Sequence, residues 1–71
     1  MRTVYPNLDK KMTENGIGVS DLARHCQIRK FSCLLKLYGV LPWKFTEVVQ
    51  ICRLFEEPKA ETLFVRLDII S

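Results

Sequence analysis

The sequence of 71 residues predicts an all-α fold of five short helices followed by a short C-terminal strand. Apolar residues recur at intervals of three and four residues along most of the chain, which is the period of an amphipathic helix. Glycine and proline interrupt this pattern repeatedly, so each helix is expected to be short. No long linker, internal repeat or low-complexity stretch divides the chain. We therefore expect one domain over residues 1–71, with a helical core at about 5–64 and a tail at 65–71.

The first helix is predicted at about Pro6–Asn15. Proline is favourable in the first turn of a helix, because the N–H that it lacks would have no helical partner there. Leu8 and Met12 lie one turn apart on the same side, and Gly16 is a favourable residue for ending the helix.

The next two helices are predicted at about Val19–Cys26 and Arg29–Tyr38, with Gln27 and Ile28 between them and Gly39 after them. The residues expected to join these helices are apolar or small: Leu22, Ala23, Cys26, Ile28, Cys33 and Leu37. Two short helices joined by a three-to-four-residue turn define the helix-turn-helix architecture. The same pattern is compatible with a plain helix bundle, and the pattern alone leaves both open.

A fourth helix is predicted at about Lys44–Phe55, after a loop that contains Pro42. Its apolar residues follow the helical period strongly: Phe45, Val48, Val49, Ile51, Cys52 and Phe55. A short fifth helix is predicted at Pro58–Phe64, with the proline at its first position. The tail Val65–Ile70 begins with alternating apolar and charged residues, which predicts a short strand.

Positive charge is concentrated in the middle of the sequence, although the net charge of the chain is only +3. Residues 22–46 contain no acidic residue and five basic ones: Arg24, Arg29, Lys30, Lys36 and Lys44. Residues 1–21 are balanced, and residues 47–71 are net acidic. This distribution is typical of a surface that binds phosphate groups; a basic helical face exposed only to solvent is the alternative.

Several short segments, taken in their order and spacing, resemble small phage and prophage repressors of the lambda-repressor-like, Cro-type helix-turn-helix family. The segments are YPNL (5–8), GI (16–17), DLA (21–23), Ile28, KLYG (36–39), PWKFTEVVQI (42–51) and ETLF (61–64). The resemblance covers about Val4–Val65. It implies a sequence-specific transcriptional regulator that binds double-stranded DNA as a dimer on a palindromic operator and represses by occluding a promoter.

The sequence departs from the family's pattern at three positions around the second helix. The family commonly has glutamine at the position of Val19, glycine at that of Gln27 and threonine at that of Gly18. Valine cannot hold a phosphate through an amide, and glycine cannot cap a helix through a side chain. Gln27 must either tolerate a backbone conformation that usually requires glycine or shift that conformation.

The residues that the resemblance assigns to DNA binding lie on the third helix and at the start of the fourth: Arg29, Lys30, Phe31, Ser32, Leu34, Leu35, Lys36, Tyr38 and Lys44. Three interpretations of the apolar members of this set remain open. In the first interpretation, Phe31 and Leu35 contact thymine methyl groups, while basic side chains bind guanine or phosphate. Alternatively, they form a surface that binds another protein, or Leu34 or Leu35 belongs to the core.

A symmetric dimer is expected because a chain of this size cannot easily bury its apolar C-terminal residues. The residues assigned to the dimer interface are Leu63, Val65, Leu67, Ile69 and Ile70. An alternative function is that of a non-enzymatic protein–protein interaction module, antitoxin-like or phage-encoded, which uses the apolar face of the third helix.

Other classes of function have little support in the sequence. His25 beside Cys26 lacks a third group that would orient a nucleophile, so no enzymatic activity and no catalytic residue are expected. The three cysteines have no zinc-site spacing and are expected to be buried, so we expect no metal, cofactor or small-molecule ligand. Trp43 is expected to anchor its loop. Without a visible secretory signal or a membrane-spanning apolar run, a cytoplasmic location is expected.

Overall fold

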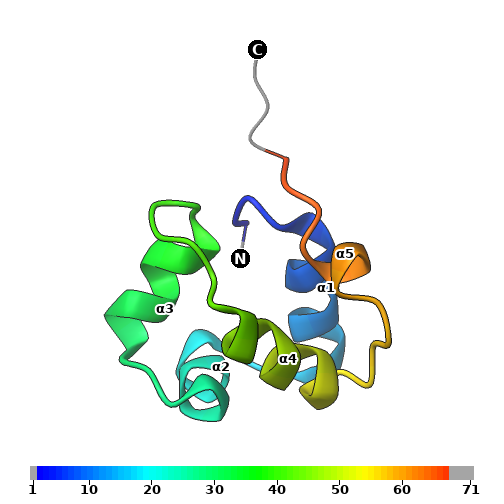
Figure 1. Cartoon of the computed structure of the whole chain (residues 1–71), viewed down its shortest axis with the longest axis horizontal. Coiled ribbons are helices and arrows are strands. Elements are labelled where there is room, and N and C mark those ends of the chain that lie inside the picture. The colour runs from blue at the N-terminus through cyan, green and yellow to red at the C-terminus, as the bar shows by residue number, and fades with distance from the viewer. Residues whose placement is uncertain (1, 68–71) are drawn as a thin grey trace.

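Residues 2–67 are described in the computed structural model, and this part of the chain contains five helices and no strand. The helices are α1 (Pro6–Asn15), α2 (Val19–Cys26), α3 (Lys30–Leu37), α4 (Phe45–Leu54) and α5 (Ala60–Leu63). In Figure 1, α2 packs against both α3 and α4, and α5 packs against α1 and α4. The radius of gyration of the Cα atoms, 11.1 Å, is that expected for one packed domain of this length.

The predicted bounds of the first two helices are confirmed, and the other three helices are shorter than predicted. Arg29 and Tyr38 flank α3 as its cap residues, so they are not helical themselves. Pro58 does not begin the fifth helix, and that prediction is wrong. Instead, the carboxylate of Glu57 accepts a hydrogen bond from the N–H of Lys59 at 3.2 Å, which forms a turn before α5 begins.

The predicted C-terminal strand is absent from residues 65–67, so that prediction is wrong for this part of the tail. The N–H of Leu67 donates to the carbonyl of Val4 at 2.8 Å, and the N–H of Val4 donates to the carbonyl of Leu37 at 3.2 Å. These single hydrogen bonds tie the tail to the N-terminal segment without forming the repeated ladder of a sheet. Residues 68–70 lie outside the described residues.

Every helix contributes to the centre of the core. Six side chains are fully buried there: Leu8, Leu22, Cys33, Leu37, Ile51 and Leu63. Complete burial of a leucine or isoleucine side chain stabilises a fold by about 1.5–3 kcal/mol. Leu63 was assigned to a dimer interface, and this is corrected here, because a side chain that is fully buried within one chain presents no surface to a second one.

The connection between α2 and α3 adopts the backbone conformation for which glycine is usual. Gln27 has a φ of 59° and a ψ of 42°, in the left-handed region. The N–H of Ile28 donates to the carbonyl of Ala23 at 3.0 Å, and the N–H of Gln27 donates to that of Arg24 at 3.1 Å. This pair of bonds is a Schellman motif, which ends α2 and directs the chain into α3. Gln27 therefore tolerates the conformation instead of shifting it.

Candidate nucleic-acid interface

The exposed side of α3 begins directly after the turn that follows α2. The side chains of Arg29 and Lys30 are exposed, and 69% of Phe31 is accessible to solvent. Ser32 is half-buried. The beginning of α3 therefore presents two positive charges and an aromatic ring side by side.

The remaining residues of α3 separate into an inner face and an outer face. Cys33 and Leu37 are fully buried against the core, which confirms their predicted role in joining α3 to α2. Leu34 is partly buried and packs against the core, whereas Leu35 is half-buried and Tyr38 is exposed. Phe31, Leu35 and Tyr38 are spaced at i, i+4 and i+7, so they form one outward stripe. Of the three interpretations of the apolar residues, assignment to the core fits Leu34 and not Leu35.

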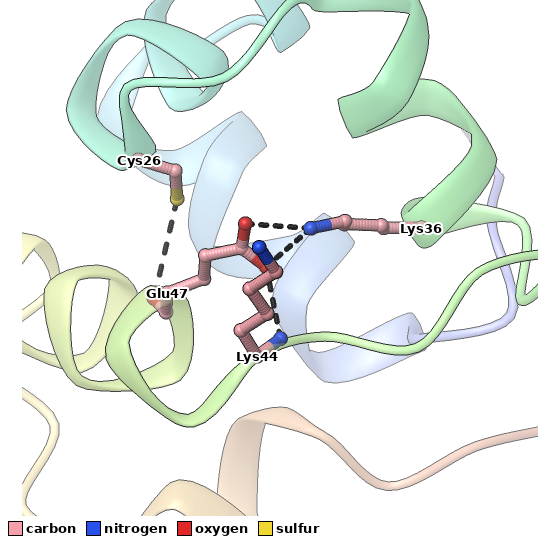
Figure 2. A network of polar contacts seen from close by, with 4 residues as sticks. All are labelled: Cys26, Lys36, Lys44 and Glu47. Carbon is pink, nitrogen blue, oxygen red and sulfur yellow. Dashed lines mark hydrogen bonds and ion pairs between the residues drawn. The ribbon is translucent and has the colours of Figure 1, made fainter.

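Lys36 is not part of the outer face, which corrects its assignment to DNA binding. Only 6% of Lys36 and 4% of Glu47 are accessible to solvent. Figure 2 shows the Lys36 ammonium group pointing at the Glu47 carboxylate, with Nζ at 2.5 Å from both carboxylate oxygens. Glu47 also accepts a hydrogen bond from the N–H of Lys44 at 2.9 Å. This ion pair joins α3 to the first turn of α4.

Two opposing effects set the ionisation of Glu47. Burial raises the pKa of its carboxyl group, but hydrogen bonds from the Lys36 ammonium and the Lys44 N–H, together with the charges of both lysines, lower it. The net pKa lies below the usual value, so the carboxylate is ionised at neutral pH and neutralises Lys36. The sequence contains a signal for this pair, because Lys36 shares the spacing of the buried residues Cys33 and Leu37.

The positive charge available at the surface is therefore smaller than the sequence count suggests. Arg24 forms an exposed ion pair with Asp21 at 3.1 Å, and such pairs contribute little to stability and exchange readily with other partners. The pKa of Asp21 is lowered by hydrogen bonds from the Gly18 N–H and the Arg24 side chain. Arg29, Lys30 and Lys44 are exposed and form no ion pair within residues 2–67.

Trp43 anchors the loop between α3 and α4, as predicted. Its ring packs edge-to-face on Phe64, with centroids 5.8 Å apart, and the Nζ of Lys36 lies 5.8 Å from its centroid. The indole Nε1 is buried without a hydrogen-bond partner in the described part of the chain. Lys44 follows directly and caps α4. The buried ion pair and Trp43 thus hold Lys44 in a fixed position relative to α3.

Within residues 2–67, no group of three or more His, Cys, Asp or Glu side chains is placed so that it could hold a metal ion. Burial raises the pKa of the Cys26 and Cys33 thiols to about 11, so both are neutral, and this agrees with their predicted place in the core. All three cysteines are free, and Cys52 is half-buried. His25 is exposed. None of the helices in residues 2–67 has the length and apolar character needed to cross a membrane.

Comparison of the chain with known protein families, curated proteins and solved structures finds no match. Its function is therefore argued from the residues of the candidate interface: the exposed beginning of α3, the outward stripe of Phe31, Leu35 and Tyr38, and the fixed position of Lys44.

Proposed function

We propose that this protein binds double-stranded DNA in a sequence-specific manner and acts as a small transcriptional regulator of the phage or prophage repressor type. In this proposal α2 and α3 form a helix-turn-helix, and α3 enters the major groove. The observation that carries the proposal is the exposed beginning of α3, where Arg29, Lys30 and Phe31 follow the α2–α3 turn directly.

Charge supports a polyanionic partner for this surface. No acidic residue occurs in residues 22–46, and Glu47, which follows, is buried against Lys36. The positive charges of Arg29, Lys30 and Lys44 are therefore not neutralised locally. Unpaired cations attract phosphate groups over a distance of about 8 Å at physiological ionic strength.

The roles of the individual side chains follow from their chemistry. Arg29 and Lys30 bind guanine edges or phosphates, and Lys44 binds a phosphate. Phe31 and Leu35 lack hydrogen-bonding atoms, so they can favour a base pair only through the thymine methyl group. We infer that this stripe selects sites with A·T pairs beneath it.

The salt dependence of binding tests this proposal. Each phosphate contact that a protein makes on duplex DNA contributes about 0.9 to the slope of log K against log salt. We expect Arg29→Ala/Lys30→Ala to weaken binding and to lower the slope by up to about 2. The matched control is Lys10→Ala/Lys59→Ala, which removes the same charge from exposed positions on α1 and before α5. Equal loss of affinity in both double variants would contradict a localised interface.

A protein-binding module is the second candidate, and one observation favours it. Exposed apolar residues continue beyond α3, because 65% of Val40 and 38% of Leu41 are accessible next to Tyr38. If the partner is a protein, the affinity should depend little on salt and should fall strongly on Phe31→Ala or Leu41→Ala. DNA binding predicts a steep salt dependence and no effect of Leu41→Ala.

A further inference from the structure

The outward side of α4 carries an apolar stripe that lies mostly outside the core. Phe45, Val48, Val49 and Cys52 are spaced at i, i+3, i+4 and i+7, which places them on one side of the helix. Phe45 is 80% exposed, and Val48 and Val49 are half-buried without packing against the core. A different side of α4 packs into the core, and Ile51 on that side is fully buried. Cys52, at one end of the stripe, packs against the core, so the exposed apolar surface of the stripe comes mainly from Phe45, Val48 and Val49.

A hollow of about 610 Å³ lies along this stripe. Its apolar lining consists of Phe45, Val48, Val49, Cys52, Pro58 and Ala60. Pro58 and Ala60 belong to the segment that leads into and begins α5, so this segment forms one wall and α4 forms the other. The hollow is therefore a groove that runs along the helix, and it fits an apolar side of another helix.

The two ends of the groove differ in charge. Lys44 lies at the end marked by Phe45, and Glu56 and Glu57 line the other end together with Arg53. Glu61 follows Ala60, which lines the groove, at the start of α5. One end is therefore positive, and the other is net negative.

We propose that a second copy of this chain occupies the groove, with the two α4 helices antiparallel. The centre of the stripe lies between Val48 and Val49. A two-fold axis at this point sets Phe45 opposite Cys52 of the partner subunit, and Val48 opposite Val49 of the partner subunit. An isologous interface requires this self-complementarity, in which each surface supplies both the projecting group and the pocket.

Charge decides the orientation of the second copy. An antiparallel pair brings the positive end of each groove to the negative end of the other, whereas a parallel pair brings like ends together. The i, i+3, i+4, i+7 spacing is also that of helices that pack at a shallow angle of about 20°. The stripe and the charges together therefore favour one arrangement.

The resemblance to repressors implies a dimer, and this inference supplies an interface for it that can be tested without DNA. The experiment is sedimentation velocity of the full chain from about 1 to about 200 µM, a range that covers weak and moderate dimers. The wild type should show a monomer–dimer equilibrium. Phe45→Glu should weaken it about 1,000-fold, since loss of an aromatic residue buried in an interface costs about 30-fold at each of two equivalent sites.

The matched control is Phe31→Glu, which makes the same change at a similarly exposed phenylalanine on α3. It should leave self-association unchanged, although it should abolish DNA binding if the proposed function is correct. A monomeric wild type at about 200 µM, or equal loss in both variants, would overturn the interface. Far-UV circular dichroism of both variants checks that they are folded.

The orientation has a separate readout. Phe45→Cys places a thiol opposite Cys52 of the partner subunit only in the antiparallel arrangement. This variant also lacks the Phe45 ring and associates weakly, so oxidation is carried out at about 200 µM, where mild oxidation traps the dimer as it forms. The covalent dimer should disappear when Cys52→Ser is added. A covalent dimer that persists after this second change would indicate the parallel arrangement and overturn the proposal. Cys26 and Cys33 are buried in the core, so they do not compete for this bond.

Discussion

Removing one partner of the Lys36–Glu47 ion pair should strongly destabilise the protein. Lys36→Met keeps an unbranched side chain that fits the site but leaves the Glu47 carboxylate buried without its ammonium partner. Glu47→Gln keeps an acceptor for the Lys44 N–H but leaves Lys36 buried and unpaired. A buried charge without a partner is far more costly than either an intact pair or an apolar replacement.

The expected magnitude follows from the burial of both side chains. Breaking a buried pair by removing one member costs about 3–5 kcal/mol. A chain of 71 residues is stable by only about 4–11 kcal/mol, so each single variant loses much or all of its folding free energy. The double variant Lys36→Met/Glu47→Gln contains no buried charge at this site. It should therefore be more stable than the sum of the single changes implies, by about 2–3 kcal/mol.

Urea denaturation measures these differences directly. Trp43 is the only tryptophan and lies beside Lys36, so its fluorescence reports unfolding next to the altered site. Circular dichroism provides a second probe of unfolding, and coincidence of its transition with that of the fluorescence shows that unfolding is two-state. A loss of less than about 1 kcal/mol in both single variants, which is typical of exposed ion pairs, would refute the assignment of a buried pair.

The same pair predicts the response to acid. Because the pKa of Glu47 is lowered in the folded protein, its contribution to stability is present above the unfolded value of 4.5 and is lost as the pH falls through the folded pKa. The wild type should therefore lose stability as the pH falls below about 4.5. Lys36→Met should lose less in this range, since it removes the ammonium hydrogen bond and charge that lower the pKa of Glu47 against the effect of burial. An equal loss in both proteins would assign the acid response to other carboxyl groups.

The remaining predictions concern single positions. Gln27→Gly should stabilise the fold by about 0.5–1 kcal/mol, measured as a higher thermal midpoint, because a left-handed backbone is strained for glutamine. Gly39→Ala should cost about 1–2 kcal/mol in urea, since φ is 78°, a backbone conformation that alanine adopts only with strain. Leu34→Ala should destabilise the domain, whereas Leu35→Ala should leave folding intact and change base preference only beneath that residue.

Local signals in the sequence were sufficient to predict α1 and α2. Pro6 at the start of α1, Gly16 at its end and the turn around Gln27 fix these helices through interactions within a few residues. The C-terminal tail could not be predicted in this way. Its alternating pattern is typical of a strand, but a strand requires a partner, and the backbone bond from Leu67 to Val4 is not part of a ladder.

The orientation of α4 and the burial of Lys36 also depend on distant partners. The apolar residues of α4 form two stripes, one around Val49 and one around Ile51, and helical periodicity does not indicate which of them meets the core. The core side of α4 also contains a charged residue, Glu47, because Lys36 from α3 neutralises it. A count of basic residues therefore overstates the charge available for DNA.

The central claim, that α3 reads DNA, is tested most directly by selecting bound duplexes from a random-sequence pool with the purified full chain at about 0.15 M salt, where non-specific attraction is weakened. We expect an enriched sequence with A·T pairs, and enrichment that is lost on Arg29→Ala/Lys30→Ala. If the wild type enriches an inverted repeat and Phe45→Glu enriches only a single half-site, recognition of the full operator depends on the α4 interface. A folded wild type that enriches no sequence would contradict the account and leave the outer face of α3 as a surface for a protein.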